Sequence, residues 1–430
     1  MPSGTSQSGP AARRLASTQQ HGQATLAPVH DGKALPAGTN DGAVSRSLNW
    51  APTPTARRRA LIGALVSVAG TGIAWGTLTP LVPVLLERQG VPGSLIGLNA
   101  AMPIAATFCI ALNLGWLMRR LGALPLLLAG IAVIVPALLA MHWFRSYEAS
   151  LVLRFVIGLG GAAHWILSET WINSAAPPER RGLMVGIYAS TFMSGFVIGP
   201  LLLASMDLDK VWPFVCIAAL VAASGIALLL VRRDLPPIAG TGTQAQWPLL
   251  LLAPIIFVAV AAAGLIDSAI WALLPVYAIE KGARESYALL LASILNAGTV
   301  GSQIMLGWMA DRTAARRVLI GCAIVCLAAS ATLPFVLDRP VLLWPALFLL
   351  GSAAAGLYSI TLAELGQRFQ GASLAAANGL FVMFYSFGLL LGAPAAGLGM
   401  DHLGPDALPA WTLLIAAAFL LTLLLGRRMT

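Results

Sequence analysis

Charged residues are scarce in this chain. Only 10% of its 430 residues are Asp, Glu, Lys or Arg, whereas 58% are hydrophobic, and the mean hydropathy is +0.82. A soluble domain of this length needs more polar surface than such a composition supplies. The composition therefore excludes a soluble protein and predicts a chain that uses lipid as its solvent.

Cysteine is scarce as well. All four cysteines fall within apolar segments, where a small apolar side chain is ordinarily buried. Cys322 and Cys326 share a helix face, but two thiols alone make a poor metal site. We therefore predict no disulfide, no metal and no cofactor. The residues also supply no nucleophile–base pair and no phosphate-binding loop, so an enzyme is not expected.

The apolar residues gather in twelve runs of about 20 residues, the length that crosses a hydrocarbon core about 30 Å thick. Backbone groups have no water to bind inside a bilayer, and continuous apolar runs lack the alternation of a barrel strand. The sequence thus predicts an all-α integral membrane protein with twelve transmembrane helices. The runs begin near Ala60, Pro92, Leu121, Ser146, Gly182, Val211, Trp247, Ser286, Arg316, Val341, Ser373 and Leu408.

Parts of the sequence occur twice. Gly115, Trp116 and Arg120 recur 192 residues later as Gly307, Trp308 and Arg312, and the same offset carries Pro83 onto Pro275 and Gly90 onto Gly282. An offset of 193 carries Gly186, Gly195 and Gly199 onto Gly379, Gly388 and Gly392. The repeat predicts two pseudo-symmetric six-helix bundles, a pattern typical of secondary transporters. We expect a disordered cytoplasmic tail over 1–56, bundles over 57–233 and 247–430, and a cytoplasmic linker over 234–246.

The positions of the basic residues predict the orientation. Most arginines fall in the loops on the side of the amino terminus, and such loops stay preferentially in the cytoplasm. We expect a multi-pass protein of the bacterial cytoplasmic (inner) membrane with both termini inside. The net charge of +9 is then a topogenic signal and an attraction to anionic lipid, not a sign of nucleic-acid binding. The expected partners are the bilayer, a small-molecule cargo and protons, and the expected working unit is a monomer.

From about residue 57 onward, the chain resembles the major facilitator superfamily. The resemblance rests on a basic loop after the second and eighth spans, with Gly115, Arg120 and Gly122 in one half and Gly307, Asp311, Arg312, Arg316 and Arg317 in the other. Arg154 precedes a glycine-rich helix face, and Gly195, Gly199 and Pro200 are similar to an element of drug antiporters. The segments around Glu169-Thr170-Trp171 and Pro178 to Gly182 are similar to the YcaD-like branch. The resemblance implies transport without naming a cargo.

Ionisable groups inside a bilayer are costly and are functional or tightly paired. Asp267 lies near the middle of the seventh span and could take up a proton or contact cargo, while Arg154 in the fourth span could bind an anionic group. Each also has a structural alternative, as a buried hydrogen-bonding group. Other polar and aromatic residues of the spans could line a central cavity, although helix packing uses the same residue types. These are Trp75, Trp271, Asn296, Gln303 and Tyr385.

A second set of charged residues lies near the inner ends of the spans. Glu169 and Glu364 occupy equivalent places in the two halves, within reach of Arg119 or Arg120 and of Arg312. We interpret them as parts of a gate that holds the bundles together. Asp311 could contact the amino terminus of the fifth span, where unpaired N–H groups favour a carboxylate.

The leading hypothesis is a secondary active transporter that moves a small organic solute by alternating access, with proton coupling through Asp267 and with efflux by antiport favoured. Proton-coupled uptake of a metabolite is the first alternative. A transport-inactive membrane receptor that signals through its tail is the second.

Overall fold

The computed structural model describes residues 53–175, 181–235, 249–369 and 371–425. Within these ranges every regular element is a helix, and the described helices belong to one compact unit. Most of the predicted tail and linker lies outside the described residues. The helices are α2 (Pro54–Glu87), α3 (Gly93–Leu121), α4 (Ala123–Trp143), α5 (Tyr147–Ala175), α6 (Arg181–Ala204), α7 (Trp212–Leu230), α8 (Leu249–Leu252), α9 (Pro254–Glu280), α10 (Glu285–Arg312), α11 (Ala315–Val336), α12 (Pro340–Arg368), α13 (Gly371–Leu403) and α14 (Ala407–Leu425).

Twelve of these helices are long, as predicted. In the described part of the chain, eleven are long and apolar enough to cross a membrane. The twelfth long helix is α10, which carries Asn296, Thr299, Ser302 and Gln303 along its middle. The first helix starts at Pro54, before the predicted bundle boundary at residue 57, because Thr53 caps it by accepting a hydrogen bond from the Ala56 N–H at 3.2 Å.

The repeat seen in the sequence recurs in the backbone. Gly90 ends the turn after α2 with a φ of 69°, and Gly282 ends the turn after α9 with a φ of 90°. Their N–H groups donate to the carbonyls of Glu87 and Ile279 at 2.9 and 2.8 Å. A side chain would strain the left-handed backbone at both positions. The predicted glycine pair therefore marks two equivalent tight turns.

Glycines also let equivalent helices pack closely in the two halves. Gly195 of α6 lies against Gly72 of α2, and Gly388 of α13 lies against Gly264 of α9, with no room for a Cβ on either pair. Small residues are how helices approach one another in lipid, where burial of apolar surface drives little association. The repeated glycines thus build one helix pair twice.

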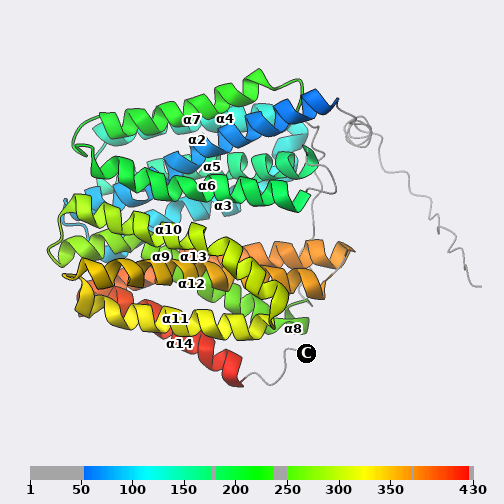
Figure 1. Cartoon of the computed structure of the whole chain (residues 1–430). Coiled ribbons are helices and arrows are strands. Elements are labelled where there is room, and N and C mark those ends of the chain that lie inside the picture. The colour runs from blue at the N-terminus through cyan, green and yellow to red at the C-terminus, as the bar shows by residue number, and fades with distance from the viewer. Residues whose placement is uncertain (1–52, 176–180, 236–248, 370, 426–430) are drawn as a thin grey trace, which may run out of the picture. The chain divides into compact units, whose positions relative to one another are not determined.

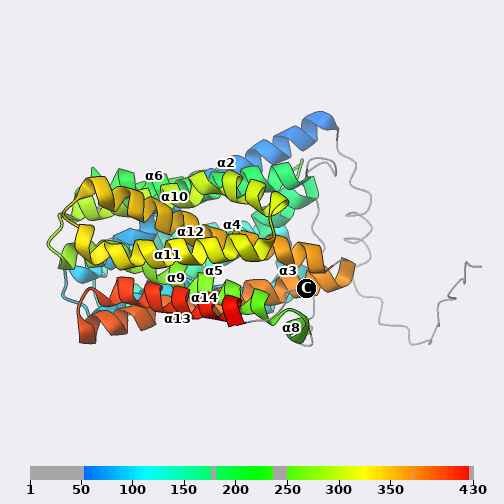
Figure 2. The same ribbon diagram turned by 60° about the horizontal axis from the view of Figure 1, so that its bottom comes forward.

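The two sets of helices, α2–α7 and α9–α14, meet along α3 with α13 and along α6 with α10. Figure 1 shows α2 to α7 in the upper part and α9 to α14 in the lower part, and Figure 2 turns the same arrangement. At the α3–α13 contact, Gly93 lies against Gly397 and Gly97 against Ala393.

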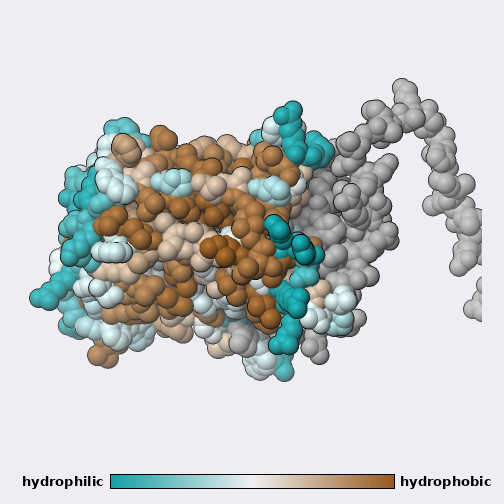
Figure 3. Space-filling view, turned by 90° about the horizontal axis from the view of Figure 1, so that it is seen from above, coloured by the Kyte–Doolittle hydropathy of each residue, from teal (hydrophilic) through white to brown (hydrophobic). Residues whose placement is uncertain are grey.

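The surface carries a wide apolar band. Figure 3 shows hydrophobic residues over the middle of one face and hydrophilic residues towards both ends of the helices. Large apolar side chains such as Leu112, Leu230 and Val341 are more than four-fifths exposed. Such a surface fits a hydrocarbon layer with water on either side, and it agrees with a membrane-spanning protein.

Candidate functional site

Asp267 lies at the centre of the molecule. It occupies the middle of α9, is 4% exposed, and accepts a hydrogen bond from the Tyr385 hydroxyl of α13 at 2.9 Å. The Tyr385 ring in turn packs on Tyr358 of α12, with ring centroids 4.7 Å apart. Among the ion pairs of the described residues, none includes Asp267. The carboxylate is therefore held by a hydroxyl rather than by a cation.

A row of four aromatic rings runs from α5 to α9. Trp165 stacks on Phe192 at 6.2 Å, Phe192 meets Phe196 at 5.6 Å, and Phe196 meets Trp271 at 5.8 Å between ring centroids. The last contact crosses from α6 to α9, so the row joins the two sets of helices. The Trp271 indole N–H is buried without a hydrogen-bond partner in the structure. We call these four residues the aromatic row.

Glu169 lies at the other end of this row. Its carboxylate lies near the Trp165 side chain, one turn away on α5. It also lies within electrostatic range of Tyr358 on α12, which belongs to the other set of helices. The predicted contact of Glu169 with Arg119 or Arg120 stays a prediction.

Three of the other predicted gating residues, Arg120, Arg312 and Glu364, contact residues of their own helices. Arg120 lies over the Trp116 ring at 4.8 Å and Arg312 over the Trp308 ring at 4.3 Å, so the duplicated sequence gives a duplicated cation–π contact. Arg119 is exposed at the end of α3.

Glu364 pairs with Arg368 on the same helix, at 3.1 Å from carboxylate oxygen to Nε. The predicted pairing of Glu364 with Arg312 is not among the ion pairs of the described residues. The Asp311 side chain lies outside the described residues.

Two predicted residues of the first half lie away from Asp267. Arg154 is 3% exposed, donates to the Leu78 carbonyl at 3.5 Å, and leaves its Nε without a partner in the structure. Trp75 packs against Gly161, where a Cβ would overlap its ring. These contacts of Arg154 and Trp75 lie between α5 and α2, so they do not join the two residues to the central carboxylate.

Two polar residues of α10 form hydrogen bonds within the second half of the chain. Asn296 is buried and donates to the Ala292 carbonyl at 2.8 Å, while its Oδ1 has no partner in the structure. Gln303 accepts a hydrogen bond from Ser359 of α12 at 2.9 Å. They are therefore candidates for lining residues, not direct partners of Asp267.

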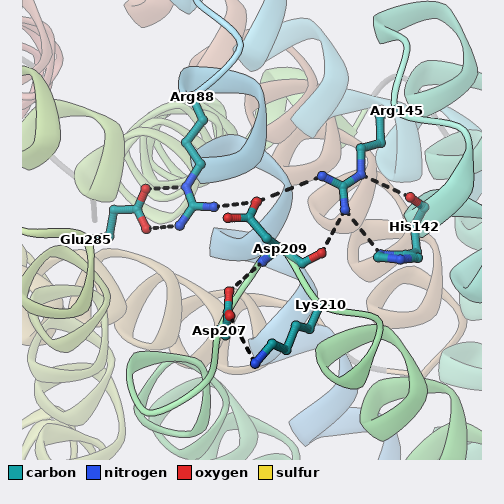
Figure 4. A network of polar contacts seen from close by, with 7 residues as sticks. All are labelled: Arg88, His142, Arg145, Asp207, Asp209, Lys210 and Glu285. Carbon is teal, nitrogen blue, oxygen red and sulfur yellow. Dashed lines mark hydrogen bonds and ion pairs between the residues drawn. The ribbon is translucent and has the colours of Figure 1, made fainter.

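Sequence reasoning missed a polar network at the end of the helices where α2 stops, which we call the Arg88 end (Figure 4). Arg88 follows α2, pairs with Glu285 at the start of α10, and reaches Asp209 at 2.9 Å. The bond to Glu285 raises the pKa of the Arg88 guanidinium above its ordinary value. Arg145 donates to the Asp209 carbonyl at 2.8 Å. These partners lie far apart in the sequence. The sequence shows that charged residues occur in these loops, but it does not show which of them form pairs.

A second contact closes the same end. The carboxylate of Asp401 on α13 accepts hydrogen bonds from the backbone N–H groups of Gly93, at 2.5 Å, and Ser94, at 3.0 Å. These N–H groups open α3, and a carboxylate at a helix amino terminus is electrostatically favourable. The two sets of helices are thus joined by polar contacts at the Arg88 end.

The opposite end, which we call the Arg120 end, is looser between α3 and α13. Cys109, Ala111, Leu112 and Asn113 are all exposed, so most sides of α3 are uncovered along this stretch. A Cβ on Gly379 of α13 would meet nothing within 4 Å, whereas Gly97 and Gly397, which lie in the α3–α13 contact at the Arg88 end, have no such room. The two helices therefore touch at one end and part towards the other.

A helical membrane protein whose two halves enclose a buried carboxylate and are joined at one end has the architecture of a transporter. The sequence matches the Major Facilitator Superfamily model over residues 64–367 and 256–428, so the chain belongs to this superfamily. It is a secondary transport protein of a membrane, not an enzyme, and it carries small-molecule cargo as members of the superfamily do.

Two relatives align with most of this chain and over nearly their whole length. An uncharacterized MFS-type transporter of Bacillus subtilis, YfkF, is 23% identical over 84% of this chain and 94% of its own. The uncharacterized MFS-type transporter YcaD of Escherichia fergusonii is 26% identical over 83% and 93%. The predicted similarity to YcaD is confirmed.

Solved transporters share the fold. A mutant form of the nucleoside transporter NupG aligns with a TM-score of 0.71 at 16% identity, over 84% of this chain and 98% of that one. A bacterial homologue of the human lysosomal transporter Spinster, inward-facing and occupied, aligns with a TM-score of 0.70 at 12% identity, over 86% and 97%.

Proposed function

We propose that this protein is a proton-coupled secondary active transporter that exports a small organic solute in exchange for protons. Asp267 is the proton-binding residue in this proposal. The exchange of the bound proton for cargo drives the transport cycle. The observation that carries the proposal is the buried Asp267 carboxylate, which is held by the Tyr385 hydroxyl and by no cation of the described residues. A carboxylate at bilayer depth without a cationic partner is suited to binding and releasing a proton.

The unequal ends of the molecule support alternating access. The Arg88 end is joined through Arg88 with Glu285 and through Asp401 with the start of α3, while α3 and α13 part towards the Arg120 end. The reverse state requires these polar contacts to break as the two halves rock. In this proposal the halves are the predicted bundles 57–233 and 247–430.

The orientation belongs to the same proposal. Arginines gather at the Arg120 end, including Arg119, Arg232 and Arg317, whereas Asp207, Asp209 and Asp406 lie at the Arg88 end. Short basic loops remain on the cytoplasmic side. The Arg120 end and both termini then face the cytoplasm, in the inner membrane of a bacterium, and the structure corresponds to an inward-open form. The working unit is a monomer.

The test is proton flux in liposomes that contain the purified protein, with a panel of lipophilic cations and small organic acids. The Asp267→Asn variant runs beside Asp338→Asn, which alters an exposed aspartate between α11 and α12. We expect a compound to trigger proton movement in the wild type and in Asp338→Asn but not in Asp267→Asn. Cargo movement without protons, or coupling that survives in Asp267→Asn, contradicts the proposal.

The sign of the flux separates export from uptake. Protons that leave the liposome lumen as cargo enters indicate antiport, and protons that enter together with cargo indicate symport. Symport would replace export by proton-coupled uptake and would leave the role of Asp267 unchanged.

A further inference from the structure

A cavity lies within the first half of the protein, at the Arg88 end. Its volume is about 300 Å³, and the described residues that line it belong to α2, α4, α5, α7 and the loops that follow α2, α4 and α6. Asp267 belongs to α9, so the cavity is separate from the central carboxylate. Small-molecule sites have volumes of about 300–1,000 Å³. The cavity is therefore large enough for one small ligand.

One side of the cavity is apolar. Leu86 of α2, Leu208 of the α6–α7 loop and Phe214 of α7 line it, and each of these residues is at most 3% exposed. Met141 near the end of α4 belongs to the same wall. An apolar group that leaves water to contact this wall is stabilised in proportion to the area that it buries. The wall therefore favours a ligand with an apolar body.

The other side of the cavity carries Arg145, which follows α4. Its Nε donates to the His142 carbonyl at 3.1 Å and its Nη2 to the Asp209 carbonyl at 2.8 Å. Within the described part of the chain, its Nη1 forms no hydrogen bond and only an ion pair with Asp209 Oδ1 at 3.8 Å. The N–H groups of Nη1 are thus available to an acceptor.

Ser150 of α5 supplies a second donor. It lines the cavity, is 6% exposed, and accepts a hydrogen bond from the Asn99 amide at 2.9 Å. None of the hydrogen bonds among the described residues uses the Ser150 hydroxyl as a donor. A buried donor without an acceptor is unfavourable, so an acceptor on a ligand would stabilise this group.

The charge of Arg145 is only partly balanced (Figure 4). The Asp209 oxygen that lies 3.8 Å from Arg145 already accepts a hydrogen bond from Arg88 Nη1 at 2.9 Å. Arg88 in turn bonds to Glu285. A ligand anion can therefore form a direct hydrogen bond with Arg145 that the Asp209 side chain does not form.

We infer that this cavity binds a small organic carboxylate with an apolar body. The two carboxylate oxygens accept from Arg145 and Ser150, and the body of the ligand contacts the apolar wall. A carboxylate fits better than a phosphate, because a phosphate brings more charge and more acceptor oxygens than these two donors can satisfy. The site is distinct from the cargo site at Asp267 and does not depend on proton coupling.

The test is equilibrium dialysis of radiolabelled phenylacetate against the purified protein in phosphatidylcholine nanodiscs, with the signal of empty nanodiscs subtracted. Unlabelled phenylacetate, phenylacetamide and phenethylamine compete, because they share a benzyl body and are anionic, neutral and cationic. We expect phenylacetate to compete at least about tenfold more strongly than the other two, as a hydrogen bond to a charged group is worth that factor. Absence of saturable binding, or equal or stronger competition by the amide or the amine, overturns the inference.

Lipid composition separates a free carboxylate from a lipid head group. The dialysis is repeated in nanodiscs that contain phosphatidylglycerol, at a salt concentration that screens the charge of the lipid surface. We expect phenylacetate to bind as before. Loss of binding there assigns Arg145 to lipid phosphate groups and overturns the inference.

Two variants locate the binding. We expect Arg145→Gln and Ser150→Ala each to weaken phenylacetate binding by about tenfold. The matched controls are Arg339→Gln between α11 and α12 and Ser205→Ala after α6, which are exposed and should bind as the wild type. Size-exclusion profiles and melting curves identify any variant that misfolds. Unchanged binding in folded Arg145→Gln and Ser150→Ala overturns the inference.

A third variant tests the sign of the ligand charge. Asp209→Asn keeps an oxygen for Arg88 but removes the negative charge that competes for Arg145. We expect phenylacetate to bind about fivefold more tightly, in keeping with the strength of an accessible ion pair. Weaker binding in Asp209→Asn indicates a site for cations and overturns the inference.

Asp267→Asn separates this site from the central one. The variant should lose proton coupling under the proposed function and should still bind phenylacetate as the wild type. Loss of phenylacetate binding in folded Asp267→Asn would assign the ligand to the central carboxylate and would overturn the second site.

Discussion

Arg88 and Glu285 hold the two halves of this transporter together at one end. The guanidinium at the end of α2 donates from Nε and Nη2 to both carboxylate oxygens at the start of α10, and its Nη1 reaches Asp209 of the α6–α7 loop (Figure 4). Two parallel bonds between an arginine and a carboxylate fix geometry as well as charge. One side chain therefore links α10 of the second half to two segments of the first half, which must part from α10 if this end is to open.

Breaking this pair should favour opening of the Arg88 end. Glu285→Gln removes the charge but keeps a similar shape, and a largely accessible ion pair contributes up to about 1 kcal/mol, or about fivefold in population. The measurement is the distance between spin labels on the two halves at the Arg88 end, by pulsed electron resonance. Lys210→Ala, which breaks an exposed pair with Asp207 within one loop, is the control. An unchanged distance distribution in Glu285→Gln contradicts the prediction that this ion pair stabilises the closed Arg88 end.

Loss of the Tyr385 hydroxyl should impair coupling more than folding. Tyr385→Phe keeps the ring that packs on Tyr358 but removes the donor to Asp267. We expect proton-driven transport to fall by about tenfold, the size of one hydrogen bond to a charged group. The control is Tyr287→Phe, whose hydroxyl accepts from Trp344 in the second half. Proton-driven transport in Tyr385→Phe equal to that of the control would remove the hydroxyl from the coupling mechanism.

Side chains at the close helix contacts should destabilise the protein. A methyl group at Gly195 would overlap the backbone of α2 at Gly72, and one at Gly388 would overlap α9. Overpacking typically costs about 1–3 kcal/mol. Melting temperatures in detergent should therefore fall for Gly195→Ala and Gly388→Ala.

The sequence repeat supplies the matched controls for these glycines. Gly186 and Gly379 correspond in the two halves, and a Cβ at either would meet nothing within 4 Å. Gly186→Ala and Gly379→Ala should leave stability equal or raise it by about 0.5–1 kcal/mol, because alanine is the better helix former. A lower melting temperature in the controls than in Gly195→Ala would contradict the close packing.

The orientation can be tested by labelling. In a chain whose native cysteines are replaced by serine, Gln89→Cys lies at the Arg88 end and Gln367→Cys at the Arg120 end, both at exposed positions. A membrane-impermeant maleimide added to intact cells should label Gln89→Cys and should label Gln367→Cys only after the cells are opened. The reverse pattern would invert the proposed orientation.

Much of the fold could be predicted from the sequence because its determinants are local. A run of apolar residues long enough to cross a bilayer must be helical, whatever its neighbours are. A turn with a left-handed backbone conformation favours glycine, so Gly90 and Gly282 predicted equivalent turns. The cost of burying a charge in lipid likewise singled out Asp267 before any contact was known.

The tertiary structure alone decided which side chains meet. Tyr385 reaches Asp267 across 118 residues of sequence, and Arg88 reaches Glu285 across 197. The four rings of the aromatic row come from three helices. Hydropathy determines that a segment crosses the membrane, but the rotation of each helix about its axis depends on packing against its neighbours. The sequence by itself therefore determined the helices and their repeat, and the packing of those helices determined the central site and the closed end.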